Sequence, residues 1–335
     1  MALLACAPHY PQSSPEMGPM RYQNWKTVCL GRYLVDVPEG IEINYFATFR
    51  NYRLNDARRL ERVPGLPADA KKMAAAKVRE FQAQPHETKG TLYIRSISLP
   101  NGGVLVQGWQ VSFATRASEA FLYIPLTIQG KSFVYTYHAE TISSSKEQQQ
   151  LRDLVAFASS LRPLPKGVIP EEDGLCFGDI MFVGVPDAFV DDLAFNFKDP
   201  HAKGLTIAFA AETALSEFRW LTKRPEWAGE ECRLMGGKKK CDKLRFGKHP
   251  VGPIQGEELC LAGRTYDGKY RMYNFTWQNP GVPNSKTSPR LTASLSYRGI
   301  PREYPTAPIP FSTEAEALAT WDRFVNSIRV RPIGQ

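Results

Sequence analysis

The sequence predicts an α+β fold made of two structurally similar domains in tandem, each an antiparallel sheet with two helices. A cysteine, one residue, a glycine, an apolar run and a final Val-Pro occur together at 29–38 and again at 176–186. Each half also ends in a helical pattern, and the apolar positions of the second helix lie 167 residues beyond those of the first. Both halves therefore follow one plan of strand pair, helix, antiparallel meander and helix, which is typical of α+β proteins.

In the first half, the opening strand is predicted over 27–37, because Pro38 lacks the N–H that a strand would donate. A hairpin partner is expected over 42–50. A helix is predicted from Pro67, which suits a first turn, to just before Pro85. Its buried face is formed by Ala70, Ala74, Val78 and Phe81. Strands follow at 91–99, 104–114, 121–128 and 131–139, with turns at 101–103 and 129–130.

The first half closes with a helix over about 146–161, for which Ser145 and Gln148 form a predicted capping box. Its buried stripe is Leu151, Leu154, Ala158 and Leu161. Proline, glycine and charge without periodicity follow, and they predict a linker. The expected organisation is 1–21 as a signal remnant or lipoprotein tether, 22–165 as the first domain, 166–174 as the linker and 175–335 as the second domain.

The second half repeats the plan, with an opening strand over 175–185 and a strand near 205–210. A helix is expected over 213–221, ended by Pro225. Strands are predicted at 243–246, 258–264, 270–278 and 291–297. The terminal helix is predicted over 314–328, with Thr313 and Glu316 as its capping box. Its stripe is Leu318, Trp321, Val325 and Ile328.

The formal net charge of +8 is concentrated in one segment, 232–249, which contains Lys238, Lys239 and Lys240. A basic patch suits an acidic protein surface, a phosphate-bearing ligand or nucleic acid, and it is equally consistent with a solvated loop tip. The second half carries about twenty more residues than the first between its landmarks, and this segment is a candidate for the difference. Insertions on a repeated plan often carry function, but loop tips also tolerate them without any.

The N-terminal segment resembles the end of a bacterial lipoprotein signal, because Leu3-Leu4-Ala5 precedes Cys6, the candidate for lipidation. The basic start and most of the apolar core of such a signal are missing, so an accidental apolar start remains the alternative. Export would place the chain in the periplasm, where disulfides persist. Residues 7–21 would then be a flexible tether.

Five cysteines remain beyond Cys6, and Cys232 with Cys241 is the best candidate disulfide because a Gly-Gly turn separates them. Closing so short a loop would stabilise the fold by roughly 3 kcal/mol on the loop-entropy model. The pairing of Cys29, Cys176 and Cys260 stays open, and at least one thiol is expected to be free. Metal binding is the weaker interpretation, because the chain has no Cys-x-x-Cys and no familiar histidine spacing.

No catalytic signature is found. The sequence has no Gly-x-Ser-x-Gly elbow, phosphate loop, dinucleotide fingerprint or His-Glu-x-x-His. Its five histidines stand in five separate contexts. These absences favour a protein with no catalytic residues, no metal and no cofactor, although a dispersed active site would leave no motif.

The opening Cys29-Leu-Gly-Arg-Tyr-Leu-Val-Asp-Val-Pro-Glu-Gly40 resembles the type VI lipase immunity family, whose members protect a bacterium from lipase-type phospholipase effectors. The resemblance spans roughly 24–332. The second opening departs from the first, with Asp179 at the position of Arg32 and Gly184 at that of Asp36. The resemblance implies a two-domain claw that grips the effector's cap region and keeps lipid from its active site. It supplies no catalytic residue.

The resulting expectation is an immunity protein in a 1:1 complex with a cognate lipase-type effector. Lys238, Lys239 and Lys240 are candidate contacts to an acidic effector surface. No nucleic acid is expected as a partner, and the membrane is expected to matter only through a lipid anchor at Cys6. Two rivals remain: a periplasmic lipoprotein that binds an anionic lipid or polysaccharide, and a hydrolase with a dispersed site.

Overall fold

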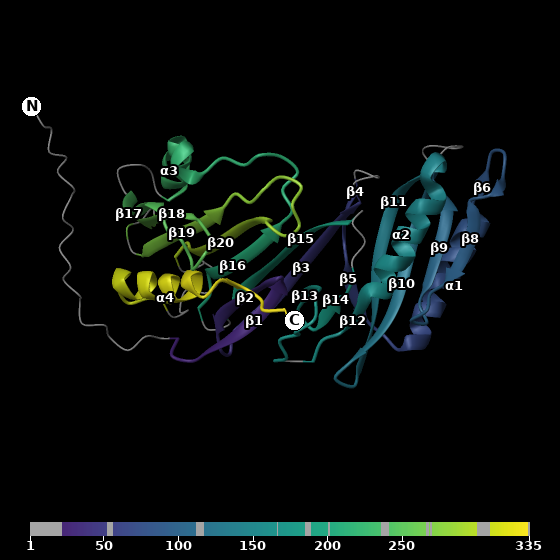
Figure 1. Ribbon diagram of the computed structural model, residues 1–335, viewed down its shortest axis with the longest axis horizontal. Helices are drawn as coiled ribbons and strands as arrows, with labels where there is room; N and C mark the ends of the chain where they lie inside the picture. Colours follow the sequence, from purple (N-terminus) through teal and green to yellow (C-terminus); the bar gives the residue numbers. More distant parts are fainter. Residues whose placement is uncertain are drawn as a thin grey trace, which may run out of the picture.

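The computed structural model describes residues 22–51, 56–111, 117–165, 167–184, 189–199, 202–235, 241–265, 268, 270–299 and 309–333. Figure 1 shows an elongated molecule in which two lobes lie at opposite ends and a group of strands connects them. The first lobe is built from the first half of the chain and the second lobe mainly from the second half. The architecture is α+β with antiparallel sheets, as the sequence predicted.

Each predicted opening strand is a tight hairpin rather than a single strand. The first consists of β1 (Trp25–Gly31) and β2 (Tyr33–Pro38), and the second of β13 (Leu175–Phe177) and β14 (Ile180–Phe182). Gly31 and Gly178 turn the chain with positive φ angles of 58° and 64°, which an L side chain rarely adopts. The glycine that the pattern places after each cysteine therefore marks a turn, and the prediction of one continuous strand was wrong.

A six-stranded sheet at the centre joins the two openings to each other. Its order is β12-β14-β13-β1-β2-β21, where β12 is Leu161–Pro163 and β21 is Arg329–Val330. At its middle, Leu30 pairs with Phe177, and each residue directly follows its own cysteine. At its edges, Arg162 pairs with Met181 and Arg329 with Leu34, which are equivalent positions of the two halves. Each half thus contributes the strand after its terminal helix to the opening hairpin of the other half.

The first lobe contains a five-stranded antiparallel sheet in the order β5-β11-β10-β9-β8. Helix α1 (Pro67–Ala83) matches the predicted helix, and α2 (Glu147–Ser160) the closing helix. Residue Lys146 is the N-cap of α2 and no side chain caps it, so the predicted Ser145 box was wrong. The strands and the 3-10 turn of this lobe are β5 (Glu61–Pro64), β6 (Pro85–His86), β7 (Gly90–Thr91), β8 (Tyr93–Ser98), β9 (Val104–Trp109), β10 (Ala117–Ile128), β11 (Lys131–Ser143) and η2 (Ser144–Lys146).

The second lobe has the same strand order when its sheet is followed from the other edge, with β16-β20-β19-β18-β17 in place of β5-β11-β10-β9-β8. Strands β15, β3 and β4 continue this sheet beyond β16 to eight strands. Residues 213–220 are not helical, and helix α3 (Pro225–Leu234) instead begins at the proline that was expected to end a helix. Proline suits a first turn because its missing N–H would have had no partner there. The remaining elements are β3 (Glu42–Asn51), β4 (Asp56–Arg59), β15 (Phe189–Lys198), β16 (Leu205–Glu212), η3 (Leu221–Lys223), β17 (Cys241–Lys248), β18 (Glu257–Arg264), β19 (Arg271–Asn279), β20 (Arg290–Tyr297) and α4 (Glu314–Asn326).

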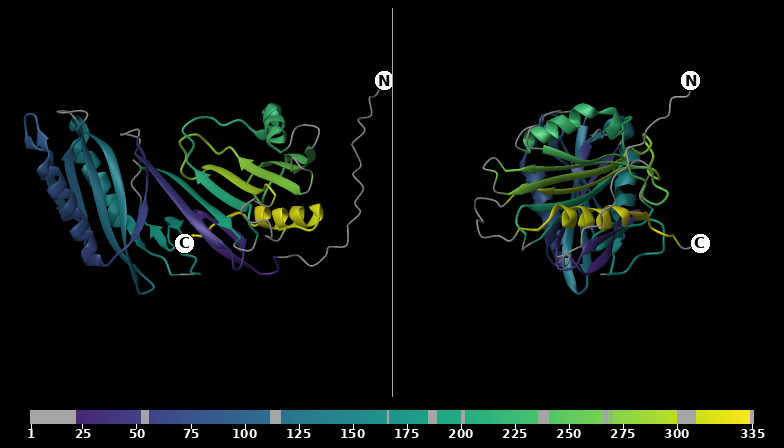
Figure 2. Two further views of the ribbon diagram at one scale, coloured as in Figure 1. Left: turned by 180° about the vertical axis from the view of Figure 1, so that it is seen from behind. Right: turned by 90° about the vertical axis from the view of Figure 1, so that its left-hand side faces the viewer.

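Both lobes place one helix on each face of the sheet. In the second lobe, α4 packs with Cys260 and Ala262, whereas α3 lies on the opposite face with Leu259 and Leu261. Figure 2 shows α3 and α4 above and below these strands. In the first lobe, α1 and α2 divide the two faces of β9–β11 in the same way. Thr313 caps α4 by accepting a hydrogen bond from the Glu316 amide at 3.1 Å, as predicted.

Strand β3 crosses from the first half into the second lobe. It pairs along its whole length with β15, rather than with the opening hairpin as predicted. The main hydrophobic core is consequently continuous, and it includes Leu122 and Phe157 from the first half together with Phe195 and Trp321 from the second. The two domains share sheets and a core, which fixes the geometry of the surface between them.

Candidate functional site

The tips of the two opening hairpins each form an ion pair across the boundary between the halves. Arg32 donates to Asp173 in the linker at 2.8 Å. Asp179, the equivalent residue of the second hairpin, accepts from Arg62 of β5 at 2.7 Å. We call the six-stranded sheet, these tips and the linker the joint. Because both pairs are partly exposed, each contributes about 1 kcal/mol or less to stability, and their main effect is on position.

A disulfide between Cys29 and Cys176 joins the same position of the two openings across the joint. The two cysteines are 147 residues apart, and their Cα atoms lie 5.6 Å from each other. Both are buried, at 8% and 0% exposure. This bond assigns two of the cysteines that the sequence left open, and Cys260 is a free buried thiol.

Arg331 holds the linker in place through hydrogen bonds to its backbone. Its side chain is 2% exposed, and its guanidinium donates to the carbonyl oxygens of Glu172 and Gly174 at 2.8 Å each, as well as to that of Pro170. These carbonyls lie in a segment without strand partners, so the arginine supplies the hydrogen bonds that a sheet would otherwise provide. The described part of the linker is thereby held against the C-terminal strand.

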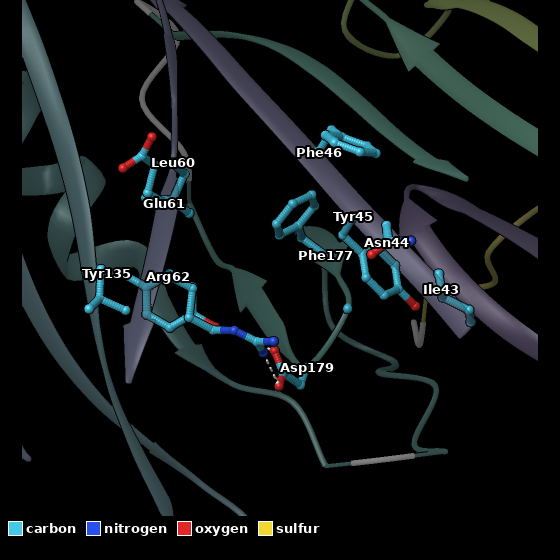
Figure 3. A pocket seen from close by; sticks show the side chains of 12 residues that line it. Ile43, Asn44, Tyr45, Phe46, Leu60, Glu61, Arg62, Tyr135, Phe177 and Asp179 are labelled. Atoms are coloured by element: carbon cyan, nitrogen blue, oxygen red, sulfur yellow. Dashed lines mark hydrogen bonds and ion pairs between the residues drawn. The ribbon is translucent and has the colours of Figure 1, made fainter. Parts of the chain in front are cut away.

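Two neighbouring cavities, of about 450 and 380 Å³, lie in the joint. Both are lined by Ile43, Tyr45, Arg62, Gly178 and Asp179, which come from both halves of the chain. Figure 3 shows Arg62 and Asp179 pointing toward each other from opposite sides of the larger cavity. We name the larger one the tyrosine cavity and the smaller one the linker cavity, because residues 164, 165 and 167–169 line the latter.

The polar lining of the tyrosine cavity is formed by two tyrosines, two carboxylates, one guanidinium and one amide, which belong to Tyr45, Tyr135, Glu61, Asp179, Arg62 and Asn44. The Tyr135 hydroxyl donates to Asp179 at 3.3 Å. Burial, reinforced by the negative charge of Asp179, raises the pKa of Tyr45 to about 12. The same two causes raise the pKa of Tyr135. Both tyrosines therefore remain neutral at physiological pH, and their hydroxyls can donate and accept hydrogen bonds.

Apolar side chains are exposed beside both cavities. Among the described residues, ten large hydrophobic side chains are exposed, and three of them line these cavities: Val63 at 38%, Val168 at 48% and Ile169 at 39%. Adjacent exposed apolar residues around a charged centre are typical of a surface that binds another molecule. The joint is therefore the candidate binding surface.

Of the residues predicted for a site, Lys238, Lys239, Lys240 and Cys6 lie outside the described residues. Cys232 and Cys241 form a disulfide whose Cα atoms are 5.4 Å apart, between the end of α3 and the start of β17. Because the three lysines stand between these cysteines in the chain, the bond fixes both ends of their segment. The structure does not test their role in binding.

A further group of titratable side chains lies in the second lobe, where His249 contacts Glu258 at 2.9 Å and Asn326 at 2.9 Å. Trp321 also donates to Glu258, at 3.2 Å. These contacts attach α4 to β18 and do not line the cavities of the joint. No group of three or more potential metal ligands occurs among the described residues. In the same part of the chain, no helix is both long enough and apolar enough to cross a membrane.

Sequence reasoning missed Arg62 and the role of Asp179. The sequence did show Arg32 and Asp179 at equivalent positions of the two openings. These residues of opposite charge stand at the two hairpin tips, and each forms an ion pair there. Arg62 gave no signal, because its partner is 117 residues away and only the fold brings them together.

Residues 26–162 match the model of the Tle cognate immunity protein 4 N-terminal domain, and residues 168–333 match that of its C-terminal domain. No curated protein sequence matches the chain.

The structure is similar to the apo structure of TplEi, an immunity protein of the type VI secretion system from Pseudomonas aeruginosa. The TM-score is 0.78 at 28% identity, over 94% of this chain and all of that one. A chain of the Tle4–Tli4 complex gives a TM-score of 0.79 at 28% identity over the same 94%, and it is also covered completely. TplEi from the same organism complexed with an "L" peptide gives 0.72 at 26% identity, over 93% of this chain and 99% of that one. The two family models match both halves of the chain, and the structural similarity covers both halves as well. The chain therefore belongs to the Tle cognate immunity protein 4 family of type VI lipase immunity proteins.

Proposed function

We propose that this chain is an immunity protein that binds a cognate lipase-type effector of a type VI secretion system and inhibits it. The observation that carries this proposal is the similarity to a chain of the Tle4–Tli4 complex, which extends over 94% of the sequence. Because the similarity covers both lobes and the joint, it supports a mode of binding common to this chain and the similar protein, and not only a common domain. The complex is proposed to contain one copy of each protein.

The proposed mechanism is that the two lobes grip the effector's cap region and block access of lipid to its active site. A lipase cap must move before substrate enters, so a protein that binds one cap position prevents turnover without contacting the nucleophile. The joint favours this use, because shared sheets, a disulfide and Arg331 hold the lobes in place before binding. Preorganisation lowers the entropy lost on binding.

The inhibitor is proposed to act in the periplasm, tethered through Cys6 or free. Two disulfides among the described residues support an oxidising compartment. The absence of a catalytic motif supports binding rather than catalysis as its activity. The purified protein is therefore expected to release no fatty acid from phospholipid.

Coexpression tests this function. A lipase-type effector of a type VI secretion system from the same organism would be directed to the periplasm of a sensitive host, with the chain supplied either with or without an export signal. Growth is expected to recover with the exported chain and not with the retained one. If neither form of the chain protects the host although both are produced and folded, the proposed function is wrong. Protection by the retained form alone would show that the protein does not act in the periplasm.

The lysine segment keeps a separate test. If Lys238, Lys239 and Lys240 meet an acidic effector surface, reversing all three charges should slow association about tenfold and flatten its salt dependence. Reversal of Lys71 and Lys72, two exposed lysines of α1 in the other lobe, is the control. An unchanged association rate would exclude the segment from the interface.

A further inference from the structure

The linker cavity combines apolar walls with positive charge. Its walls include Val28, Leu164, Val168 and Ile169. Leu164 is buried, but Val168 and Ile169 are 48% and 39% exposed at neighbouring positions of the linker. Arg331 holds the carbonyl of Pro170, the next residue, so the two apolar side chains are displayed from a fixed backbone. A fixed, exposed apolar pair beside a cavity is suited to an apolar ligand group.

Lys26 supplies the charge that lacks a counterion. It lies on β1, lines the linker cavity and is half-buried. Within the described part of the chain, its side chain has no ion pair or hydrogen bond. The other ions of this cavity, Arg62 and Asp179, already neutralise each other at 2.7 Å. The cavity therefore carries one uncompensated positive charge next to its apolar walls.

A half-buried ammonium group beside apolar walls favours a ligand that brings a carboxylate and an apolar group together. The carboxylate would replace water around the ammonium group, and the apolar group would cover the exposed valine and isoleucine. A protein segment with an acidic residue next to an apolar one meets both requirements. Such a segment also fits the shape of the linker cavity, because the cavity is open to solvent and is lined by residues of both halves of the chain.

We propose that the linker cavity is a binding subsite for an acidic-apolar segment of the effector, with Lys26 as the partner of the carboxylate and Val168 and Ile169 as the apolar contacts. This inference rests on the proposed function and names one contact within it. It differs from the predicted contact at Lys238, Lys239 and Lys240, which stand in the second half of the sequence. An anionic lipid shares the same chemistry and is the outcome that the test must separate.

Binding of a purified lipase-type effector from the same organism is measured for the wild type, for Lys26→Glu, for Ile169→Asp and for the control Lys89→Glu. Lys89 is an exposed lysine between β6 and β7 in the first lobe. We expect Lys26→Glu and Ile169→Asp each to weaken binding at least about tenfold, mainly through faster dissociation, and the control to change it less than about twofold. Lys26→Met should weaken binding less than the reversal and reduce its salt dependence, because it removes one charge pair.

Thermal unfolding of each variant separates loss of binding from loss of fold, and little change is expected because Lys26 has no partner to lose. If the wild type binds and protects while Lys26→Glu and Ile169→Asp bind like it, this inference is wrong and the proposed function stands. If the wild type does not bind the lipase, the proposed function itself fails. Vesicles containing phosphatidylglycerol provide the last arm: loss of vesicle binding in Lys26→Glu, with lipase binding unchanged, would make the cavity a lipid site and overturn the inference.

Discussion

At the scale of single residues, the joint depends on side chains that satisfy backbone groups outside any sheet. Arg331 is the main example, because one buried guanidinium donates to three carbonyls of the linker. Removing it would leave the buried carbonyls of Pro170 and Gly174 without their donor. Hydrogen bonds to a charged group are each worth more than a neutral one.

Replacing Arg331 by alanine is expected to lower the free energy of unfolding by about 3 kcal/mol or more. Arg329→Ala is the matched control, since Arg329 is 45% exposed and pairs with Asp36, so its loss should cost about 1 kcal/mol or less. Denaturant unfolding of both variants measures the difference. Equal effects of the two substitutions would show that the linker does not depend on Arg331.

His249 gives the second lobe a dependence on pH. The hydrogen bond to Glu258 raises the pKa of His249 above its ordinary value despite partial burial. Burial works against ionisation of Glu258, but the bonds from His249 and Trp321 outweigh it and lower the pKa of that carboxyl. The charged histidine thus stabilises the fold fully below its unfolded pKa of about 6.5 and loses this contribution as pH rises through the raised value. The glutamate contribution is present above its unfolded pKa and is lost as pH falls.

His249→Gln should therefore destabilise the protein most near about pH 6 and progressively less toward about pH 9. The measurement is the difference in unfolding free energy between wild type and variant across this range. A difference that stays constant with pH would mean that His249 is held as a neutral ring.

At the scale of elements, periodicity predicted the helices α1, α2 and α4 and most strands, because local amphipathic patterns determine them. It failed where tertiary pairing decides. Nothing in 42–51 indicates that β3 should leave its own half and pair with β15. Pro225 was misinterpreted because proline is compatible with both an end and a beginning of a helix, and only the packing of α3 on β18 distinguishes them.

The two disulfides act on different lengths of chain. On the loop-entropy model, the bond Cys29–Cys176 closes 147 residues and should contribute about 5 kcal/mol. The bond Cys232–Cys241, with a separation of 9, should contribute about 3 kcal/mol. We expect the double variant C29S/C176S to be less stable than C232S/C241S in denaturant unfolding under oxidising conditions. The reverse order would mean that residual structure already restricts the unfolded chain without the long-range bond.

At the scale of the whole molecule, the two halves were expected to be tandem domains joined by a linker and arranged as a claw. The tandem plan is found, but sheets and core cross the boundary, and the cavities lie on the surface of a continuous structure. The candidate site was therefore predictable only in outline. Equivalent openings indicated where the halves meet, whereas Lys26, Arg62 and Asp179 come together through pairings that no local pattern encodes.

A continuous core predicts one cooperative unfolding transition for the oxidised protein, because neither lobe can lose its packing without exposing the other. Calorimetry should give equal calorimetric and van't Hoff enthalpies. Two resolved transitions, or a van't Hoff enthalpy near half the calorimetric one, would contradict a shared core and favour lobes that move independently.

The central claim is that this preformed joint and its two lobes inhibit a lipase by binding it. The most direct test is a titration of the purified lipase-type effector from the same organism, acting on phospholipid vesicles, with the purified chain. Fatty-acid release is expected to fall in proportion to added protein and to reach the background at one equivalent. Undiminished release at a large excess of correctly folded, oxidised protein would contradict the account.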